Sequence, residues 1–548
     1  MSNIVPAERP RSDFSRELEN FIRAGYQILL IRTHEETRVE GEIMSMAQSL
    51  DPPQPVITWD IFEAFQAFES REATSVQELS ADAKKMRNPV TALDSLVSED
   101  SNHPQSAIIV MRDLDDFMKL PDVQRRLKTF AEGNRLVNRV IKRTLIILTS
   151  QTNIPPKLQQ SITVIDFSLP NFDQMLNIVD FIRDGLPPAT AELDDDLKDK
   201  VATNLLGLTT MEAENCLSRC IVIHRGFSRE MLQTIQDEKA TIIRKGQVLT
   251  YIPKSEVVST EQVGGYDVYM DWLRRRGLAY SKEARSHDLD YPRGCVLLGP
   301  PGTGKSMVAK VTCDVLGLPG YVLDVGSLFG SMVGESEGRT REALRQVEAQ
   351  QGCVLVIDEA DKALGNATTS QGDSGVTRRV FGTLLTWLAE NKHKTFCIMT
   401  LNRTEGMPPE LFRAGRFDKV WYTDLPNDNE KRAIAEIHFS KRGITPEMLQ
   451  FGDDEWESIC SKMKGFVGSE IEEAVIESRY LAFDADHSTA VPTLDQFLAA
   501  IGSIVPVSSL DDAGVSSIRE FCKDRATAVT SEQPARRTRR RARNIETN

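Results

Sequence analysis

The sequence of 548 residues has no apolar run that approaches the ~18 residues needed to span a bilayer. Its first residues, MSNIVPAERPRSDF, lack the apolar segment of a secretory signal. Only Cys216 and Cys220, of eight scattered cysteines, stand close together, and no His/Cys set elsewhere completes a metal site with them. The sequence therefore predicts no membrane segment, reduced core thiols and a cytoplasmic type of compartment.

An excess of basic residues is also absent, since 66 Lys and Arg face 80 Asp and Glu, for a net charge of −14. This balance excludes a protein whose whole surface binds nucleic acid or anionic membrane, so any basic site must be local. A hydrophobic content of 40% and a charged content of 27% are typical of globular chains. At roughly 150 residues per domain, the length predicts three to four structural units.

The stretch GPPGTGKS lies between an apolar run, Cys295 to Leu298, and an apolar-periodic segment from Met307 onward, which predicts strand, loop and helix. Such a loop turns backbone N–H groups onto a polyphosphate, and the following helix directs its positive end to the same place. We expect Lys305 to reach the β- and γ-phosphates of ATP and Ser306 to hold Mg²⁺. The residues expected to bind the nucleotide here are Gly299, Pro300, Pro301, Gly302, Thr303, Gly304, Lys305, Ser306 and Met307.

Two acids follow the apolar run of VLVIDEAD, at the strand end where ligands bind in open α/β sheets. We expect Asp358 to hold the Mg²⁺ shell and Glu359 to act as a general base or to polarise the attacking water. Asn402, at the end of the next predicted strand, TFCIMTLNRT, could bridge the γ-phosphate and water, or serve as a simple turn former.

The first half of the chain repeats the order of the second. AIIVMRDLDDF parallels VLVIDEADKA, TLIILTSQT parallels TFCIMTLNRT, and ITVIDFSLPN parallels DKVWYTDLPN, which indicates a tandem duplication. The first copy has IRTHEETR in place of the phosphate loop, with Glu35 and Glu36 facing the phosphate position and Arg112 in place of Asp358. Because carboxylates there would repel a nucleotide, the first copy is expected to be catalytically dead; an unrelated α/β domain is the alternative.

The motifs GPPGTGKS, VGESEGR, VIDEAD, TLNR and LFRAGRFD occur in this order over about residues 261–505, and they resemble the AAA ATPases of the unfoldase-like branch. With the degenerate first copy and the phrases GDSGVTRRVFGTLLTWLAE and LDVGSLFGSMVGESE, nearly the whole chain resembles a chloroplast and cyanobacterial AAA family named hypothetical chloroplast open reading frame forty-six. The resemblance implies ATP and Mg²⁺ as ligands and a homo-oligomer of the hexameric ring type.

The resemblance also assigns roles beyond the loop and the acids. It makes Arg413 an arginine finger acting on the neighbouring subunit, Arg416 its companion and Asn402 a first sensor; the sequence alone leaves surface ion pairing open for the two arginines. Met332 stands where a central pore loop usually carries an aromatic side chain, so the resemblance leaves threading of a polypeptide open. The residues matched to adenosine contacts are Gly264, His438, Gly468 and Ser469.

The predicted fold is α/β, with tandem AAA-type units that each combine a parallel-sheet P-loop core with a helical lid. The expected segments are a lead-in (1–13), a degenerate core (14–170), its lid (171–245), a linker (246–260), the active core (261–427), its lid (428–505) and a tail (506–548). The tail ends in PARRTRRRARNIETN, which is expected to be solvated or to contact nucleic acid or an acidic partner.

The sequence thus predicts Mg²⁺-dependent ATP hydrolysis coupled to remodelling of a protein partner, in the cytoplasm or, for a plastid-encoded chain, the stroma. A nucleotide-controlled assembly scaffold that threads nothing is the first alternative. A nucleic-acid motor or loader, supported only by the arginine-rich end, is the second.

Overall fold

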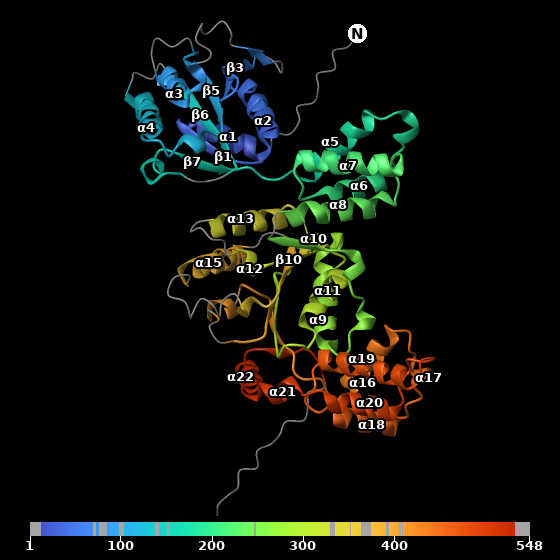
Figure 1. The fold of residues 1–548 in the computed structure, drawn as a ribbon. Coiled ribbons are helices and arrows are strands. Elements are labelled where there is room, and N and C mark those ends of the chain that lie inside the picture. The colour runs from blue at the N-terminus through green and yellow to red at the C-terminus, as the bar shows by residue number, and fades with distance from the viewer. Residues whose placement is uncertain are drawn as a thin grey trace, which may run out of the picture. The chain divides into compact units, whose positions relative to one another are not determined.

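The computed structural model describes residues 12–68, 73–75, 85–97, 103–136, 142–150, 154–245, 248–328, 335–350, 352–362, 374–390, 394–404, 407, 409–413 and 415–531. The chain forms two compact units (Figure 1). The first consists of Met1–Pro170 with Leu208–Asn215, and the second of Asn171–Gly207 with Cys216–Asn548.

The first unit contains a seven-stranded sheet in the order β4-β3-β2-β5-β6-β1-β7, in which β2, β5, β6, β1 and β7 run parallel. Successive residues of β1 enter different cores: Ile28 and Leu30 pack on one face of the sheet, and Leu29 and Ile31 on the other. This alternation is why a continuous apolar run forms a strand covered on both faces. The strands are β1 (Ile28–Arg32), β2 (Val56–Asp60), β3 (Ala64–Phe68), β4 (Ala73–Ser75), β5 (Ser106–Arg112), β6 (Lys142–Thr149) and β7 (Thr163–Asp166), and the helices are α1 (Asp13–Arg23), α2 (Glu36–Gln48), α3 (Pro89–Val97) and α4 (Pro121–Leu136).

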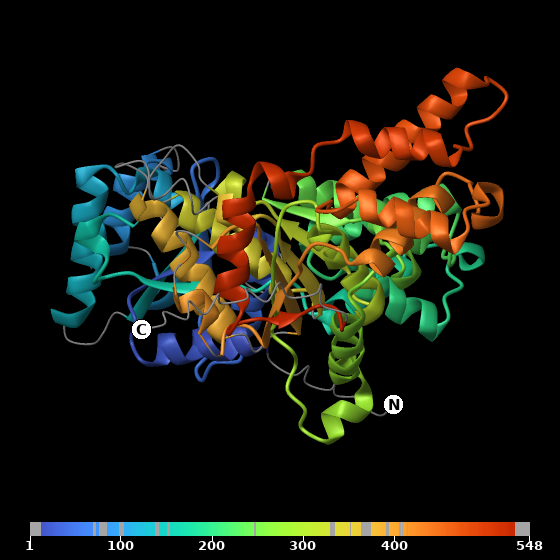
Figure 2. The same ribbon diagram turned by 90° about the horizontal axis from the view of Figure 1, so that it is seen from below.

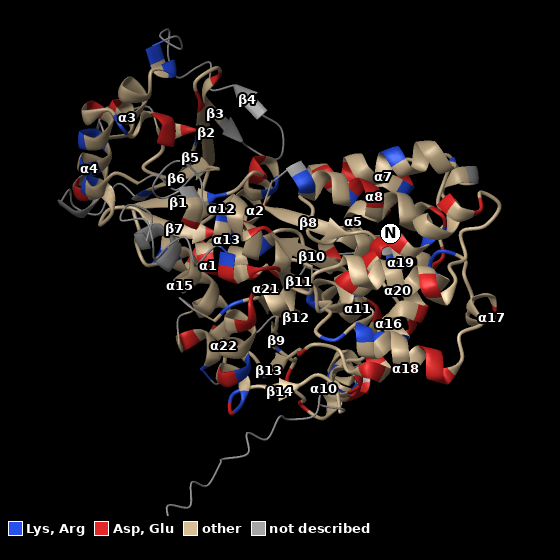
Figure 3. Cartoon of the chain, turned by 60° about the horizontal axis from the view of Figure 1, so that its bottom comes forward, with Lys and Arg blue, Asp and Glu red and all other residues tan. Residues whose placement is uncertain are grey.

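The second unit holds a second seven-stranded sheet, in the order β14-β13-β9-β12-β11-β10-β8, and the labels in Figure 3 follow this order from β8 to β14. All of its neighbouring strands are parallel except β8 and β10. The strands are β8 (Leu249–Ile252), β9 (Gly294–Leu298), β10 (Gly320–Leu323), β11 (Cys353–Ile357), β12 (Thr395–Leu401), β13 (Lys419–Tyr422) and β14 (Thr527–Ala528). The helices of this core are α9 (Asp267–Gly277), α10 (Lys282–Ser286), α11 (Lys305–Leu316), α12 (Val325–Leu328), α13 (Glu335–Glu348) and α15 (Ser374–Glu390).

The two sheets share a five-stranded parallel core with the same connectivity. In the first, the order β7-β1-β6-β5-β2 corresponds to chain order 5-1-4-3-2, and β13-β9-β12-β11-β10 repeats it in the second. The tandem arrangement predicted from the paired sequence motifs is therefore confirmed.

Each core is followed by a helical lid, and the first lid helix begins in the same way in both copies. Asn171 caps α5 and Asn427 caps α16, each through a reciprocal capping box with the residue three positions on. The first lid comprises α5 (Phe172–Asp184), α6 (Asp195–Leu205), α7 (Thr210–His224) and α8 (Met231–Lys245); the second comprises α16 (Asp428–Ser440), α17 (Pro446–Leu449), α18 (Asp453–Lys462), α19 (Gly468–Ala485) and α20 (Leu494–Ser503).

Two segments differ from the sequence prediction. The expected linker 246–260 contains β8, which pairs antiparallel with β10. The expected tail 506–548 contains α21 (Val507–Leu510), α22 (Asp512–Cys522) and β14, the red end of the described ribbon in Figure 2. The buried face of α22 consists of Val515, Ile518 and Cys522, and the last two lie in the hydrophobic core of the second unit. Residues 1–11 and the arginine-rich sequence after Ser531 lie outside the described residues.

All eight cysteines are buried free thiols, as expected from their scattered positions. Among the described helices, none is by itself long and apolar enough to cross a membrane; one bent pair, Leu494–Leu510 with Asp512–Cys522, meets the length and composition test only in combination. Basic and acidic residues are interspersed along the helices drawn in Figure 3.

Candidate nucleotide site

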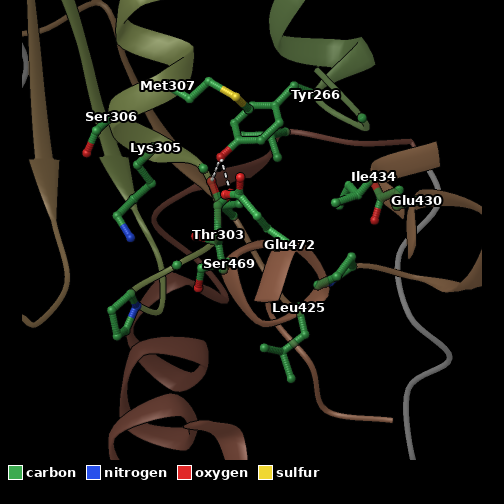
Figure 4. Close-up of a pocket in the computed structure, with 18 of the residues that line it drawn as sticks. Tyr266, Thr303, Lys305, Ser306, Met307, Leu425, Glu430, Ile434, Ser469 and Glu472 are labelled. Atoms are coloured by element: carbon green, nitrogen blue, oxygen red, sulfur yellow. Dashed lines mark hydrogen bonds between the residues drawn. The ribbon is translucent and has the colours of Figure 1, made fainter. Parts of the chain in front are cut away.

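A cavity of about 330 Å³ lies at the carboxyl ends of β9, β11 and β12, where the lid helices α16 and α19 meet the core (Figure 4). The end of a parallel sheet is where ligands bind in open α/β folds. Most of the residues predicted to bind nucleotide line this cavity, namely Gly264, Pro301, Gly302, Thr303, Gly304, Lys305, Ser306, Met307, Asp358, Glu359, Asn402, His438, Gly468 and Ser469.

The phosphate loop takes a shape that only glycine accommodates at two positions. Gly302 and Gly304 have φ of 80° and 87°, and Gly304 directly precedes α11. A Cβ on Gly302 would lie 2.4 Å from the Ser469 hydroxyl oxygen. The loop therefore needs glycine both for its left-handed turns and for the close approach of the lid.

Lys305 is the first residue of α11, and its side chain is buried, with 5% of the residue exposed. Its ammonium donates to the carbonyl oxygens of Gly299 and Pro300, at 2.8 and 2.7 Å. Burial lowers the pKa of this lysine to about 8. A cation held in a poorly solvated position gains most from an anionic ligand, so the site fits a polyphosphate.

Ser306 and Asp358 provide the donor set that Mg²⁺ prefers. The Ser306 hydroxyl donates to Asp358 Oδ1 at 3.0 Å, and the Thr400 hydroxyl donates to the same carboxylate oxygen. Hydroxyl and carboxylate oxygens on two adjacent elements, facing a phosphate loop, fit a Mg²⁺ ion that keeps several of its waters.

Glu359 follows Asp358 with a left-handed backbone, φ 49°, which is uncommon for a residue with a side chain. Its N–H donates to Thr400 Oγ1 at 2.8 Å, and its carboxylate accepts from Asn402 Nδ2 at 3.2 Å and pairs with Lys362. The structure thus brings Glu359 and Asn402 together from two neighbouring strands, in contact with each other at the cavity.

The lid contributes α16 and α19. His438 is mostly buried, and burial is the main reason that its pKa is lowered. Its Nδ1 lies 3.3 Å from a Glu472 carboxylate oxygen but without hydrogen-bonding geometry. The Ser469 N–H donates to the Gly302 carbonyl at 3.2 Å, so α19 begins directly on the phosphate loop.

Four predicted residues do not line the cavity. Gly299 and Pro300 act through their carbonyl groups on Lys305. Arg413 is exposed and lines a different hollow, together with Asp288, Arg293 and Arg525, whereas Arg416 is half-buried and donates to the Leu385 carbonyl of α15. Neither arginine lines the cavity around Lys305. Met332 falls outside the described residues.

The sequence analysis did not identify several lining residues. Tyr266 precedes α9, and its hydroxyl donates to the Thr303 carbonyl at 2.9 Å, a bond drawn dashed in Figure 4. The Gly264-Gly265 pair before Tyr266 is the sequence feature that could have placed Tyr266 near the site. Val529 and Thr530 also line the cavity, but nothing in the sequence after residue 505 marked them.

The corresponding position of the first copy is filled by its own charged residues. Three residues separate β1 from α2, against six between β9 and α11, so the first copy has no loop that could wrap a phosphate. Arg112 donates two hydrogen bonds of 2.7 Å to the Glu40 carboxylate, and these bonds are the main reason that its pKa is raised. Asp113 keeps the left-handed backbone of Glu359, with φ 53°, although its neighbour has changed from acid to base.

The glycine-bearing loop, the buried Lys305, the Ser306–Asp358 pair and the Glu359–Asn402 pair under a helical lid define a P-loop ATPase. Family models agree: residues 295–425 match the ATPase family associated with various cellular activities (AAA), 14–167 match the N-terminal domain of SpoVK-like AAA ATPases, and 173–246 match their second domain.

The chain belongs to the AAA ATPase family, and it is an ATP-hydrolysing enzyme. It is 32% identical over 513 residues to the AAA domain-containing protein ycf46 of Pyropia yezoensis, covering 93% of this chain and 98% of that protein. It is 30% identical to ycf46 of Guillardia theta over 93% of this chain and 94% of the relative. Over half of its length it is 28% identical to the cell division cycle protein 48 homologue of Archaeoglobus fulgidus, of which 36% is covered.

Proposed function

We propose that this protein hydrolyses ATP with Mg²⁺ in a homo-oligomeric, ring-type assembly and uses the cycle to remodel a protein partner. The observation that carries the hydrolytic part is the convergence of Lys305, Ser306, Asp358, Glu359 and Asn402 from three strand ends onto one cavity. The partner and the ring rest on the likeness to relatives such as the proteasome subunit RPT4 of yeast, 28% identical over 225 residues.

In this proposal Lys305 would bind the β- and γ-phosphates, and Ser306 and Asp358 would hold Mg²⁺, which would supply charge neutralisation at the phosphates. Glu359 orients the attacking water and accepts its proton, while the Asn402 amide fixes the carboxylate through the 3.2 Å bond. The lid residues His438, Gly468 and Ser469, with Gly264, enclose the adenosine.

Arg413 is assigned to the site of the neighbouring subunit. Arg413 is exposed to solvent. It lines the hollow that also contains Arg293 and Arg525, and it does not line the cavity around Lys305. An arginine that must stabilise γ-phosphate charge from such a place needs a second copy of the chain. Arg416, whose guanidinium is bound to the Leu385 carbonyl, would support this surface from within the core.

The Lys305→Ala variant tests the nucleotide assignment. Removal of the ammonium leaves phosphate charge uncompensated in a backbone cradle, so ATP binding should be lost while the fold persists. Equal ATP affinity of wild type and variant, measured by calorimetry, would reject the assignment. Lys200→Met, an exposed lysine on α6, serves as the matched control.

The Glu359→Gln variant tests the partner. It should bind ATP without turnover and retain what the enzyme acts on, so proteins co-purified with the ATP-loaded variant and released by ADP would be candidate clients. Met332→Ala should weaken partner-stimulated hydrolysis and spare basal hydrolysis if the pore loop contacts the client. If no protein is retained and ATP only changes the assembly state, the protein is a nucleotide-controlled scaffold instead.

Binding of nucleic acid through the arginine-rich end is the remaining alternative. Titration of labelled DNA and RNA at several salt concentrations, with and without residues 532–548, distinguishes it, since affinity that survives the truncation would favour a nucleic-acid motor. A reducing compartment, the cytosol or a plastid stroma, fits the eight buried free thiols.

A further inference from the structure

We infer that the C-terminal segment Thr527–Ser531 is part of the nucleotide site, where Val529 and Thr530 form a wall for the nucleoside half of ATP. The inference rests on the proposed nucleotide site and adds a binding element from outside the matched AAA residues, 295–425. Val529 and Thr530 line the same cavity as Lys305.

The segment is fixed to the core by main-chain bonds on both sides. Residues of β14 pair in parallel with β13, with Trp421 beside Thr527 and Tyr422 beside Ala528. The Val529 N–H then donates to the Tyr422 carbonyl at 3.1 Å, and the Val529 carbonyl accepts from the Tyr269 N–H at 3.2 Å. The segment is thus held between the last core strand and α9.

The side chains of the segment strengthen this attachment. Val529 is 3% exposed and belongs to the core cluster that includes Tyr269 and Trp421. Ser531 donates to the Asp267 carboxylate twice, from its N–H at 3.1 Å and from its hydroxyl at 2.6 Å. Residues 529–531 therefore have a defined place beside the start of α9, although they follow a sequence that is polar overall.

The start of α9 also contacts the phosphate loop. Tyr266 directly precedes α9 in a left-handed conformation, and its hydroxyl donates to the Thr303 carbonyl at 2.9 Å. The Tyr266 hydroxyl oxygen also lies 3.2 Å from Thr423 Oγ1. One helix end thus connects the C-terminal segment to the loop that binds phosphates.

The sheet order indicates which part of ATP the segment contacts. Lys305 and Ser306 follow β9, and Asp358 and Glu359 follow β11, which lies two strands further along the sheet. β13 and β14 lie on the other side of β9. Thr530 is therefore at the end of the cavity away from Asp358, which would hold Mg²⁺, and from Glu359, and the segment faces the nucleoside and not the γ-phosphate.

Cysteine protection in the full chain tests the inference. All eight native thiols are buried, so Thr530→Cys introduces one accessible reactive site. Saturating Mg·ATP, or ADP with Mg²⁺, should slow maleimide alkylation at residue 530 by about ten-fold or more, because a contact that excludes reagent shifts the accessible population. Ser509→Cys, on the exposed surface of α21, should react at the same rate with and without nucleotide.

A second variant tests by binding affinity whether residue 530 contacts the nucleotide. Thr530→Trp should weaken binding of a fluorescent ATP analogue by about ten-fold, equivalent to 1.4 kcal/mol, whereas Ser509→Trp should leave it unchanged. Protection at residue 530 should also vanish when Lys305→Ala is added. Nucleotide binding with no protection and no loss of affinity at residue 530 would overturn the inference and leave the proposed function intact; absence of nucleotide binding in the wild type would overturn both.

Discussion

The Glu35 carboxylate accepts a hydrogen bond of 2.6 Å from the backbone N–H of Thr210, the first residue of α7. It also forms an ion pair of 2.6 Å with Arg38. In the second copy the matching lid helix begins on the phosphate loop instead, through the Ser469 N–H and the Gly302 carbonyl. A protein carboxylate thus lies at the N-terminus of α7 in the first copy and bonds to it directly.

Glu35→Ala should loosen this junction. The substitution leaves the Thr210 N–H without its acceptor and removes the ion pair of the largely buried Arg38, which keeps its bond to the Ser168 carbonyl, at a cost of about 1–3 kcal/mol. Hydrogen exchange at residues 210–213 should accelerate. Glu36→Ala is the matched control, since its more exposed carboxylate lies 3.7 Å from Arg112 and should cost less. Equal exchange in both variants would show that Glu35 does not hold α7.

One nucleotide should bind per chain. The first copy has a three-residue connection where the second has six, and its Arg112 is already paired with Glu40. Equilibrium dialysis with ATP should therefore give a stoichiometry near one, falling to zero in Lys305→Ala. A value near two would show that the first copy retains a site.

The motifs proposed to bind phosphate could be recognised in the sequence because their residues are contiguous and the proposed chemistry demands particular residue types. Lys305, Ser306 and Asp358 all line the cavity, and Ser306 donates to Asp358, while their roles stay predictions. The duplication was predictable because buried parallel strands keep their apolar runs even after the site is lost. Asp113 of the first copy shows this, because it keeps the left-handed backbone conformation that Glu359 has in the second copy although the site around it is lost.

The parts that escaped prediction depend on long-range pairing. β14 is two residues long, and the Val529 that follows it packs in the core cluster of Tyr269 and Trp421 and bonds through its backbone to Tyr422 and Tyr269. β8 sits in a stretch that resembles a linker, and it pairs with β10 about seventy residues later. A local sequence pattern cannot predict either strand, because the stability of both strands comes from tertiary contacts.

ATP affinity should fall as pH rises above about 8. Burial lowers the pKa of free Lys305 to about 8, and bound phosphate charge should raise it, so binding requires proton uptake at higher pH. The dissociation constant of Mg·ATP should be flat from pH 6.5 to 7.5 and increase by up to about ten-fold per unit above 8. Calorimetry in two buffers of different ionisation enthalpy measures the uptake directly. A constant affinity up to pH 9.5 would contradict the assignment.

Lys239→Met should stabilise the protein near neutral pH. Lys239 is buried on α8, donates to Gln350 Oε1 at 2.7 Å, and has a pKa lowered to about 7 by burial. Since the unfolded chain binds more protons above pH 7, this lysine makes stability rise with pH between about 7 and 10. The variant should melt about 2–4 °C higher at pH 7, with the difference shrinking towards pH 10.

The acceptor in this pair would not be left unsatisfied, because the Tyr321 hydroxyl also donates to Gln350 Oε1, at 2.9 Å. Cys216 and Cys353 also face Lys239, and both stay neutral thiols near pH 7, because the hydrogen bond with Cys220 and then burial raise the pKa of Cys216, and burial raises the pKa of Cys353. Lys200→Met, at an exposed position, should not change the melting curve. A lower melting temperature for Lys239→Met at every pH would refute the prediction.

Arg413→Ala should keep ATP affinity and lose turnover, by about 10³ to 10⁵ in rate, because a finger acts on transition-state charge. Mixing it with Lys305→Ala protein distinguishes a shared site from a site within one chain. Each variant is inactive alone, but mixed assemblies contain interfaces with an intact loop and an intact finger. Recovery of phosphate release supports the trans role, and its absence in demonstrably mixed oligomers rejects it.

The two outermost strands of the second sheet, β8 and β14, come from outside residues 261–505, where the AAA motifs lie. Each covers a strand that would otherwise present unpaired N–H and C=O groups, β10 at one edge and β13 at the other. Bare edges recruit strands from other molecules. An excised core of residues 261–505 should therefore aggregate or form fibrillar contacts at concentrations where the full chain stays dispersed.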